Sequence, residues 1–225
     1  MTAESQPRVF IYGMQSSGAS LLALLAAQAP ETLAVIDLWN PEVAPEISHD
    51  GPIVLKATTG PVSLTAHIAR FRPTALVLML RHPVDQISVL GNESFRDYAL
   101  PIEAKLRTFD HVFVHADDFD VVVSYEQLTA SPSSVAAALR NTGLPLPADA
   151  HLFPRSVQDV VAYAREHSSW CDKHWRIGWG TGRLHPSLSS STETLTTLRV
   201  PPVSQTSEAM SLAREHCPVL LMHYT

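Results

Sequence analysis

Lysine is scarce in this chain. Of its 225 residues 16 are Lys or Arg, and just three of these are lysines, Lys56, Lys105 and Lys173. Asp and Glu together number 22, so the formal net charge is −6. A net negative field repels polyanions and argues against nucleic acid as a partner. We therefore expect any anionic ligand to be held by a local site, and no lysine occurs before position 56 to contribute to one.

Cysteines and long apolar runs are scarce as well. Two cysteines, Cys171 and Cys217, provide no disulfide framework in a chain of this length, and we expect free thiols. The longest apolar stretches, such as 21–27 and 75–80, are far shorter than the roughly 20 residues that span a bilayer. The first residues contain no basic segment followed by an apolar run of signal-peptide length. The sequence therefore predicts a cytoplasmic protein without membrane insertion.

Short apolar strands alternate with helices along the chain. Strand-like runs occupy residues 8–12, 33–38, 53–57, 75–80 and 120–124. Helical stretches lie near 20–28, 62–71, 84–92, 102–116, 133–142 and 207–216. The near-continuous apolar character of the runs is typical of parallel strands covered on both faces. The pattern predicts a three-layer α/β/α fold with a central parallel sheet. We expect one domain over residues 1–225, with 75–80 as the central strand and a loop-rich segment from about residue 168.

A glycine-containing loop follows the first strand-like run. Residues 13–20, GMQSSGAS, have the spacing of the phosphate-binding loop G-x-x-x-x-G-K-S/T, with Ala19 in place of the lysine. Backbone N–H groups of residues 15–20 and the positive end of a helix that begins at Ser20 can still hold an anion. The ammonium that reaches the phosphates of a nucleoside triphosphate is missing. Alternatively, the loop is a tight turn between strand and helix without a ligand.

A second motif, RHPVD at residues 81–85, follows the most hydrophobic run. It lies at the carboxyl end of a strand, which is where α/β sheets bind ligands. Ser88 comes seven residues after Arg81, and an arginine fork with a hydroxyl suits a phosphate. Alternatively, Arg81 pairs with Asp85 at the start of a helix. Together the two motifs predict a ligand with two separated anionic groups.

Four stretches, taken in order, resemble the sulfotransferases that use 3′-phosphoadenosine 5′-phosphosulfate (PAPS). The first, GMQSSGASLL at 13–22, is similar to the family's 5′-phosphosulfate loop. The second, LMLRHPVDQIS at 78–88, resembles its 3′-phosphate motif, and VVVSYEQLTASP at 121–132 is similar to a strand and turn common in bacterial members. The fourth, WRIGWGTGR at 175–183, resembles the glycine-rich segment that closes over the nucleotide. The resemblance covers residues 10–183 and implies a sulfotransferase architecture like that of the P-loop nucleotide hydrolases.

The resemblance also implies roles for individual residues. The residues that would bind the donor are Gly13, Gln15, Ser16, Ser17, Gly18, Ala19 and Ser20 at its 5′-phosphosulfate, and Arg81, Ser88, Arg176, Gly178 and Arg183 at its 3′-phosphate and nucleotide. The family usually has Lys or Arg where Ser16 stands, so we expect Lys56 to supply that cation. Thr58 stands where some members have a histidine base, so Asp37 or Glu42 is the candidate base. No complete set of three or four metal ligands emerges from the eleven histidines.

The sequence thus predicts an enzyme that transfers a sulfuryl group from PAPS to a hydroxyl or amine of a small-molecule acceptor, without a metal. The product of the donor would be adenosine 3′,5′-bisphosphate. Two alternatives stay open: a P-loop small-molecule kinase, and a protein that binds the donor but has lost catalysis, for which Ser16 and Thr58 argue. The sequence leaves open the acceptor and the oligomeric state, for which a homodimer is one option.

Overall fold

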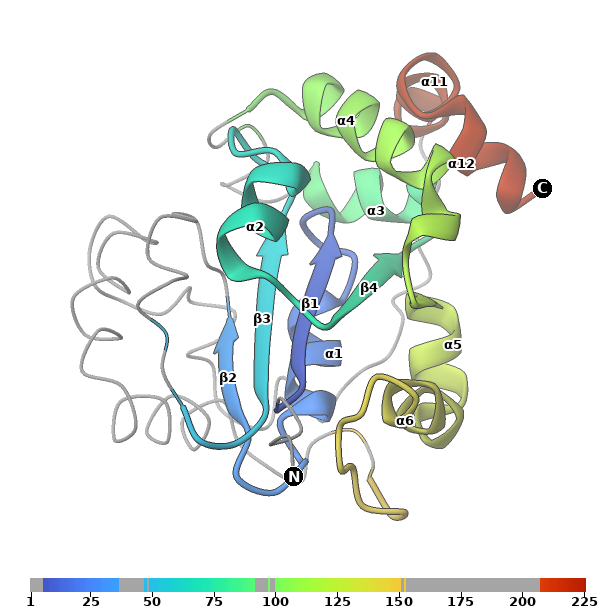
Figure 1. Ribbon diagram of the computed structural model, residues 1–225. Coiled ribbons are helices and arrows are strands. Elements are labelled where there is room, and N and C mark those ends of the chain that lie inside the picture. Colours follow the sequence, from blue (N-terminus) through green and yellow to red (C-terminus); the bar gives the residue numbers. More distant parts are fainter. Residues whose placement is uncertain are drawn as a thin grey trace.

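The computed structural model describes residues 6–36, 47, 49–91, 97, 100–150, 152 and 207–225. Within these residues the chain forms a five-stranded sheet with the order β2-β3-β1-β4-β5 (Figure 1). Every neighbouring pair of strands is parallel. The strands are β1 (Arg8–Gly13), β2 (Leu33–Ile36), β3 (Ile53–Thr58), β4 (Ala75–Leu80) and β5 (Val121–Ser124).

Helices cover both faces of this sheet. They are α1 (Ala19–Ala26), α2 (Leu64–Phe71), α3 (Pro83–Leu90), α4 (Ile102–Val114), α5 (Tyr125–Ala130), α6 (Pro132–Arg140), α11 (Ser207–His216) and α12 (Pro218–His223), with a 3-10 turn at Ala116–Asp118. In Figure 1, α2 lies in front of the sheet, and α1 lies behind it and packs on β1, β2 and β3. The predicted three-layer α/β/α fold with a central parallel sheet is confirmed.

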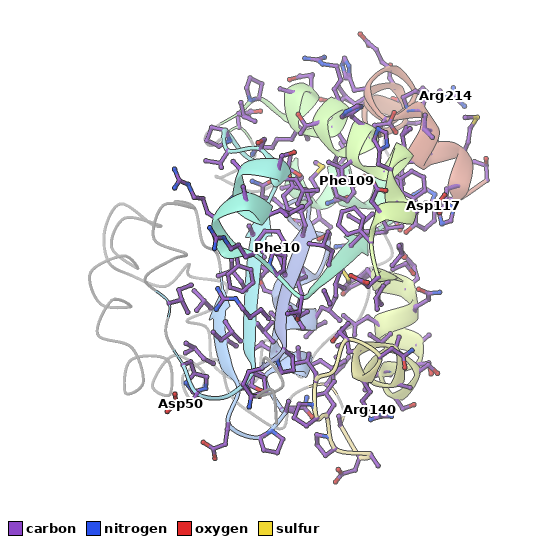
Figure 2. All side chains as sticks on the ribbon, viewed as in Figure 1. Phe10, Asp50, Phe109, Asp117, Arg140 and Arg214 are labelled. Atoms are coloured by element: carbon purple, nitrogen blue, oxygen red, sulfur yellow. The ribbon has the colours of Figure 1, made fainter. Side chains whose placement is uncertain are left out.

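Alternation along β1 divides its side chains between these two faces. The ring of Phe10 faces α2, with ring centroids 5.6 Å from His67 and 5.9 Å from Phe71 (Figure 2). Because successive side chains of a strand point to opposite faces, Ile11 lies on the α1 face. Lys56 of β3 is in register with Ile11 and therefore shares that face. The sheet thus directs Lys56 to the side on which the chain leaves Gly13 to form α1.

The prediction that residues 75–80 form the central strand is wrong. In the described sheet β1 has two strands on either side, whereas β4 lies between β1 and the edge strand β5. Strands β1 and β4 each have a neighbouring strand on both sides, and both are therefore apolar along their length. The apolar character of a strand thus does not show which of the two is central. Burial is more complete in β1, where residues 9–12 are 0% exposed, than in β4, where Leu76 is partly exposed.

The order of the strands creates a crevice at the carboxyl ends of β1 and β4. The chain leaves β1 through α1 toward β2, and it leaves β4 toward β5 on the opposite side of the sheet. Two adjacent strands whose connections diverge in this way form a topological switch point, which is the usual ligand crevice of open α/β sheets. The loop after Gly13 and the segment that begins at Arg81 both start there.

The end of the chain packs back on the helices that follow β4. Helices α11 and α12 contact α3 and α4, and the Leu220 N–H donates to Oδ1 of Asp110 at 2.8 Å. The apolar segment that begins at Pro218 forms helix α12. Cys217, next to it, is a buried free thiol whose pKa is raised to about 12 by burial and by Asp110. No helix in the described ranges is long and apolar enough to cross a membrane.

Candidate anion-binding site

Two glycines allow the loop after β1 to turn tightly. A Cβ on Gly13 would lie 2.6 Å from Oγ of Ser17, and a Cβ on Gly18 would lie 2.6 Å from Cδ2 of Tyr125. Gly18 has φ +90°, a conformation that side chains disfavour, and it caps α1 without a side-chain hydrogen bond. Ser16 also has a positive φ, of 62°. The loop therefore depends on the absence of a side chain at both glycines.

Three side-chain hydrogen bonds fix this loop, two of them to its own carbonyl groups. Gln86 of α3 donates from Nε2 to the Gln15 carbonyl at 2.7 Å. Arg81 donates from Nη1 to the Ser16 carbonyl at 2.9 Å. The Gln15 side chain in turn donates to the carbonyl of Thr59, beyond the end of β3, at 2.8 Å. The loop is thus tied to the ends of both strands that flank β1.

Most backbone N–H groups of the loop are available to bind a ligand. Ser17 N–H donates to the Met14 carbonyl at 3.1 Å, so residue 17 does not contribute the free donor that we expected. Within the described part of the chain, the N–H groups of residues 15, 16 and 18–21 have no acceptor. The first bond of α1 runs from the Leu22 N–H to the Gly18 carbonyl. Free N–H groups at the positive end of a helix form an anion-binding cradle.

Buried polar atoms without partners are concentrated at the same place. Eight such side-chain atoms occur among the described residues, and all except Nδ1 of His67 belong to β1, its loop, or the segments after β3 and β4. They are the Tyr12 hydroxyl, Oε1 of Gln15, Oγ of Ser17, Oγ1 of Thr59, Nε of Arg81, Nδ1 of His82 and Oε1 of Gln86. Buried polar atoms are nearly always hydrogen-bonded. Their concentration therefore marks a place built for a ligand or for ordered water.

Arg81 is a buried cation that contacts the loop directly. Arg81 is 6% exposed, and its guanidinium stacks on the ring of Tyr125, with Cζ 4.4 Å from the ring centroid. In the described part of the chain no carboxylate forms an ion pair with Arg81, so the alternative in which it pairs with Asp85 is wrong. Burial raises the pKa of the Tyr125 phenol, while the charge of Arg81 opposes part of that rise.

A cluster around Glu126 links Arg81 to the end of the chain. Glu126 accepts the N–H of His82 at Oε1, 3.0 Å away, and the hydroxyl of Tyr224 at Oε2, 3.4 Å away. The rings of His82 and Tyr224 meet edge to face at 5.1 Å. Burial and the nearby Glu126 carboxylate raise the pKa of Tyr224. Tyr224, the residue that follows α12, therefore contacts the residue directly after Arg81.

The other predicted site residues that the structure describes lie on α1, α3 and β3. Ser88 donates its hydroxyl to the Val84 carbonyl of its own helix at 2.8 Å. Lys56 is buried, at 4% exposed, two residues before the end of β3 on the face of Gly13 and α1. Ala19 and Ser20 form the first turn of α1, which begins one residue earlier than expected.

Five predicted site residues lie outside the described residues: Asp37, Glu42, Arg176, Gly178 and Arg183. Within the described ranges, no group of three or more His, Cys, Asp or Glu residues could hold a metal ion. Sequence reasoning missed Gln86, Thr59 and Tyr125, which hold the loop or Arg81 in place. Gln86 lies within the RHPVDQIS stretch, and this motif was the signal that could have pointed to it.

No protein-family model and no curated protein matches this chain. Among solved structures it is similar to mouse sulfotransferase SULT7A1 complexed with PAP, with a TM-score of 0.48 and 13% sequence identity. That alignment covers 93% of this chain and 84% of the mouse protein's chain. Similarity at this level does not assign the chain to a family.

Proposed function

We propose that the protein is a PAPS-dependent sulfotransferase that transfers a sulfuryl group to a hydroxyl or amine of a small-molecule acceptor. One observation carries the proposal: at the switch point of the sheet, N–H groups at the start of α1 that have no acceptor among the described residues lie beside the buried Arg81, which forms no ion pair with a described carboxylate. The ordered motifs of the sequence favour PAPS as the anion that occupies this site.

The residues present suit a 5′-phosphosulfate. The N–H groups of residues 15, 16 and 18–21 are donors, and the buried hydroxyl of Ser17 has no partner. Neither α1 nor the loop contains a carboxylate that would repel an anion. Preorganised donors of this kind stabilise negative charge that develops on a leaving oxygen without reorganisation. The site therefore fits both the donor and the bisphosphate that leaves.

The transfer itself needs few covalent roles from the protein. The acceptor oxygen or nitrogen attacks the sulfur, the bond from sulfur to the bridging phosphate oxygen breaks, and its electron pair leaves with adenosine 3′,5′-bisphosphate. The acceptor's proton goes to a general base, for which we propose Asp37 or Glu42. Lys56 is proposed to help neutralise the leaving group, and its place on the α1 face supports that role. Positioning and charge neutralisation supply most of the catalysis in such transfers.

A P-loop kinase is the second candidate, and the spacing of the loop favours it. Two features argue against it. Ala19 replaces the lysine that contacts triphosphates, and the residues that directly follow β3 and β4 are Thr59 and Arg81 rather than the carboxylate that would hold Mg²⁺. A protein that binds the donor without catalysis differs from our proposal in turnover alone.

Calorimetric titration with adenosine 3′,5′-bisphosphate and with Mg-ATP separates the first two candidates. We expect the bisphosphate to bind with a dissociation constant in the micromolar range and Mg-ATP to bind at least tenfold more weakly. Tight binding of Mg-ATP with no response to the bisphosphate would refute the sulfotransferase.

Incubation with radiolabelled PAPS and a mixture of metabolites tests turnover. We expect label to appear in an acceptor, and the Lys56→Ala variant to transfer it more slowly because charge on the leaving group is less well neutralised. Binding of the bisphosphate without any transfer would favour the protein that has lost catalysis.

A further inference from the structure

Arg81 carries a positive charge in an environment that does not balance it. The residue is 6% exposed, and no carboxylate in the described part of the chain forms an ion pair with it. Its Nε is buried and has no hydrogen-bond partner. A buried charge is costly unless it is paired and hydrogen-bonded. Among the described residues the guanidinium therefore has no counter-anion, which makes it a candidate to bind an anionic ligand.

Three contacts fix where the guanidinium lies. Nη1 of Arg81 donates to the carbonyl of Ser16 at 2.9 Å, so the guanidinium touches the loop itself. The ring of Tyr125, on which Arg81 stacks, packs so closely on Gly18 that a Cβ there would lie 2.6 Å from Cδ2. The guanidinium thus lies beside the loop at Ser16 and, through Tyr125, near Gly18, where α1 begins.

We propose, on the basis of the proposed function, that Arg81 is a cation of the 5′-phosphosulfate site, in addition to Lys56. It takes the place of the lysine that is missing at position 19, while Lys56 keeps the role proposed for it at the leaving group. This assignment differs from the 3′-phosphate role that the sequence motif implies for Arg81. It predicts that the charge acts on the group that is transferred and on the phosphate that leaves.

The hydrogen bond of the Ser88 side chain differs from that of Arg81. The motif implies that Arg81 and Ser88 hold the same phosphate, but the Ser88 hydroxyl donates to the Val84 carbonyl within α3. The α3 side chain that shares the loop with Arg81 is Gln86, which holds the Gln15 carbonyl next to Ser16. Arg81 and Gln86 therefore act as a pair on consecutive loop carbonyls.

Two nucleotides that differ in one phosphate test this assignment. Adenosine 5′-monophosphate carries the 5′-phosphate alone, and adenosine 3′,5′-bisphosphate carries both. Each is titrated calorimetrically into the wild type and into Arg81→Gln, with Arg214→Gln as the matched control, because Arg214 is exposed on α11 and lies away from the loop (Figure 2). We expect Arg81→Gln to weaken both nucleotides by the same factor, about tenfold or more, and Arg214→Gln to change neither.

The ratio of the two affinities decides the result. An unchanged affinity for the monophosphate with a weakened bisphosphate would place Arg81 at the 3′-phosphate and overturn the inference, while leaving the proposed function intact. If the wild type binds neither nucleotide, the proposed function fails and the inference fails with it. Arg81→Lys keeps the charge for the case in which Arg81→Gln does not fold. Partial unfolding weakens the apparent affinity for both nucleotides by the same factor, so the ratio of their two dissociation constants can still be compared with that of the wild type.

Discussion

At the scale of single residues, the site depends on where side chains are absent as much as on where they are present. Ser17 and Tyr125 fill the space that a side chain on Gly13 or Gly18 would need. The spacing of the two glycines was visible in the sequence. What could not be predicted is that the second glycine leaves room for the ring that supports Arg81, because this contact joins residues far apart in the chain.

Gly18→Ala should destabilise the protein. The new Cβ would require φ +90° and would collide with the ring of Tyr125, so we expect the free energy of unfolding to fall by about 2 kcal/mol or more. Urea denaturation measures the change. Gly91→Ala is the matched control, because Gly91 has φ −56° and its nearest neighbour would be 3.4 Å from the Cβ. That variant should be neutral or more stable by about 0.5 kcal/mol. Equal losses in both would show that the Tyr125 contact is unimportant.

At the scale of elements, the sequence predicted most strands and helices but not those whose signals were short. The run 75–80 and the helix 207–216 have the bounds we expected. Helix α5 was expected as a turn, because its six residues offer less than two full periods of an apolar pattern. Its start is nevertheless encoded, since Ser124 and Gln127 form a reciprocal capping box. A short helix such as α5 can thus be stabilised by its cap and its packing even though it is too short to show an apolar periodicity.

The capping box gives a prediction for α5. Ser124→Ala removes the acceptor of the Gln127 N–H, which lies 3.1 Å from Oγ, and should cost about 1 kcal/mol in the free energy of unfolding. Ser131→Ala is the control, because Ser131 begins α6 without a side-chain cap bond and should cost clearly less. Urea midpoints of the two variants at neutral pH provide the comparison. A loss for Ser131→Ala as large as that for Ser124→Ala would contradict the role of the box.

At the scale of the whole molecule, the stability of the fold depends on pH through a buried histidine. His67 is 2% exposed, and burial lowers its pKa to about 4 from an ordinary value near 6.5. Between these two values the unfolded chain binds a proton that the folded chain does not bind. The stability that neutral His67 allows is therefore fully present above about pH 6.5 and is lost as the pH falls toward 4.

This linkage predicts a loss of about 2 kcal/mol in the free energy of unfolding between pH 7.5 and pH 5 that is attributable to His67 alone. His67→Leu should remove that part of the pH dependence, and His111→Gln, at an exposed position on α4, should keep it. Chemical denaturation of the three proteins at both pH values measures the difference. Parallel curves for the wild type and His67→Leu would show that His67 does not titrate on unfolding.

The arrangement of the whole sheet was predictable in class but not in order. Apolar runs that alternate with helices indicate a parallel α/β sheet, because a strand that is buried on both faces is apolar along its whole length. The order of the strands is set by crossovers between distant segments, and nothing local in residues 75–80 distinguishes a central strand from its neighbour. The same limit explains why the two anion motifs were expected to lie apart, although Arg81 touches the loop.

The central position of β1 also bears on how the protein is made. Residues 13–20 leave the ribosome early, but their partners Thr59, Arg81, Gln86 and Tyr125 follow later. At 5–20 residues per second, the 105 residues from Ser20 to Tyr125 take roughly 5–20 s to translate. A nascent chain that ends before Tyr125 contains the whole loop sequence and no assembled cradle. Anion binding should therefore arise late in synthesis, in a single step with the completion of the sheet.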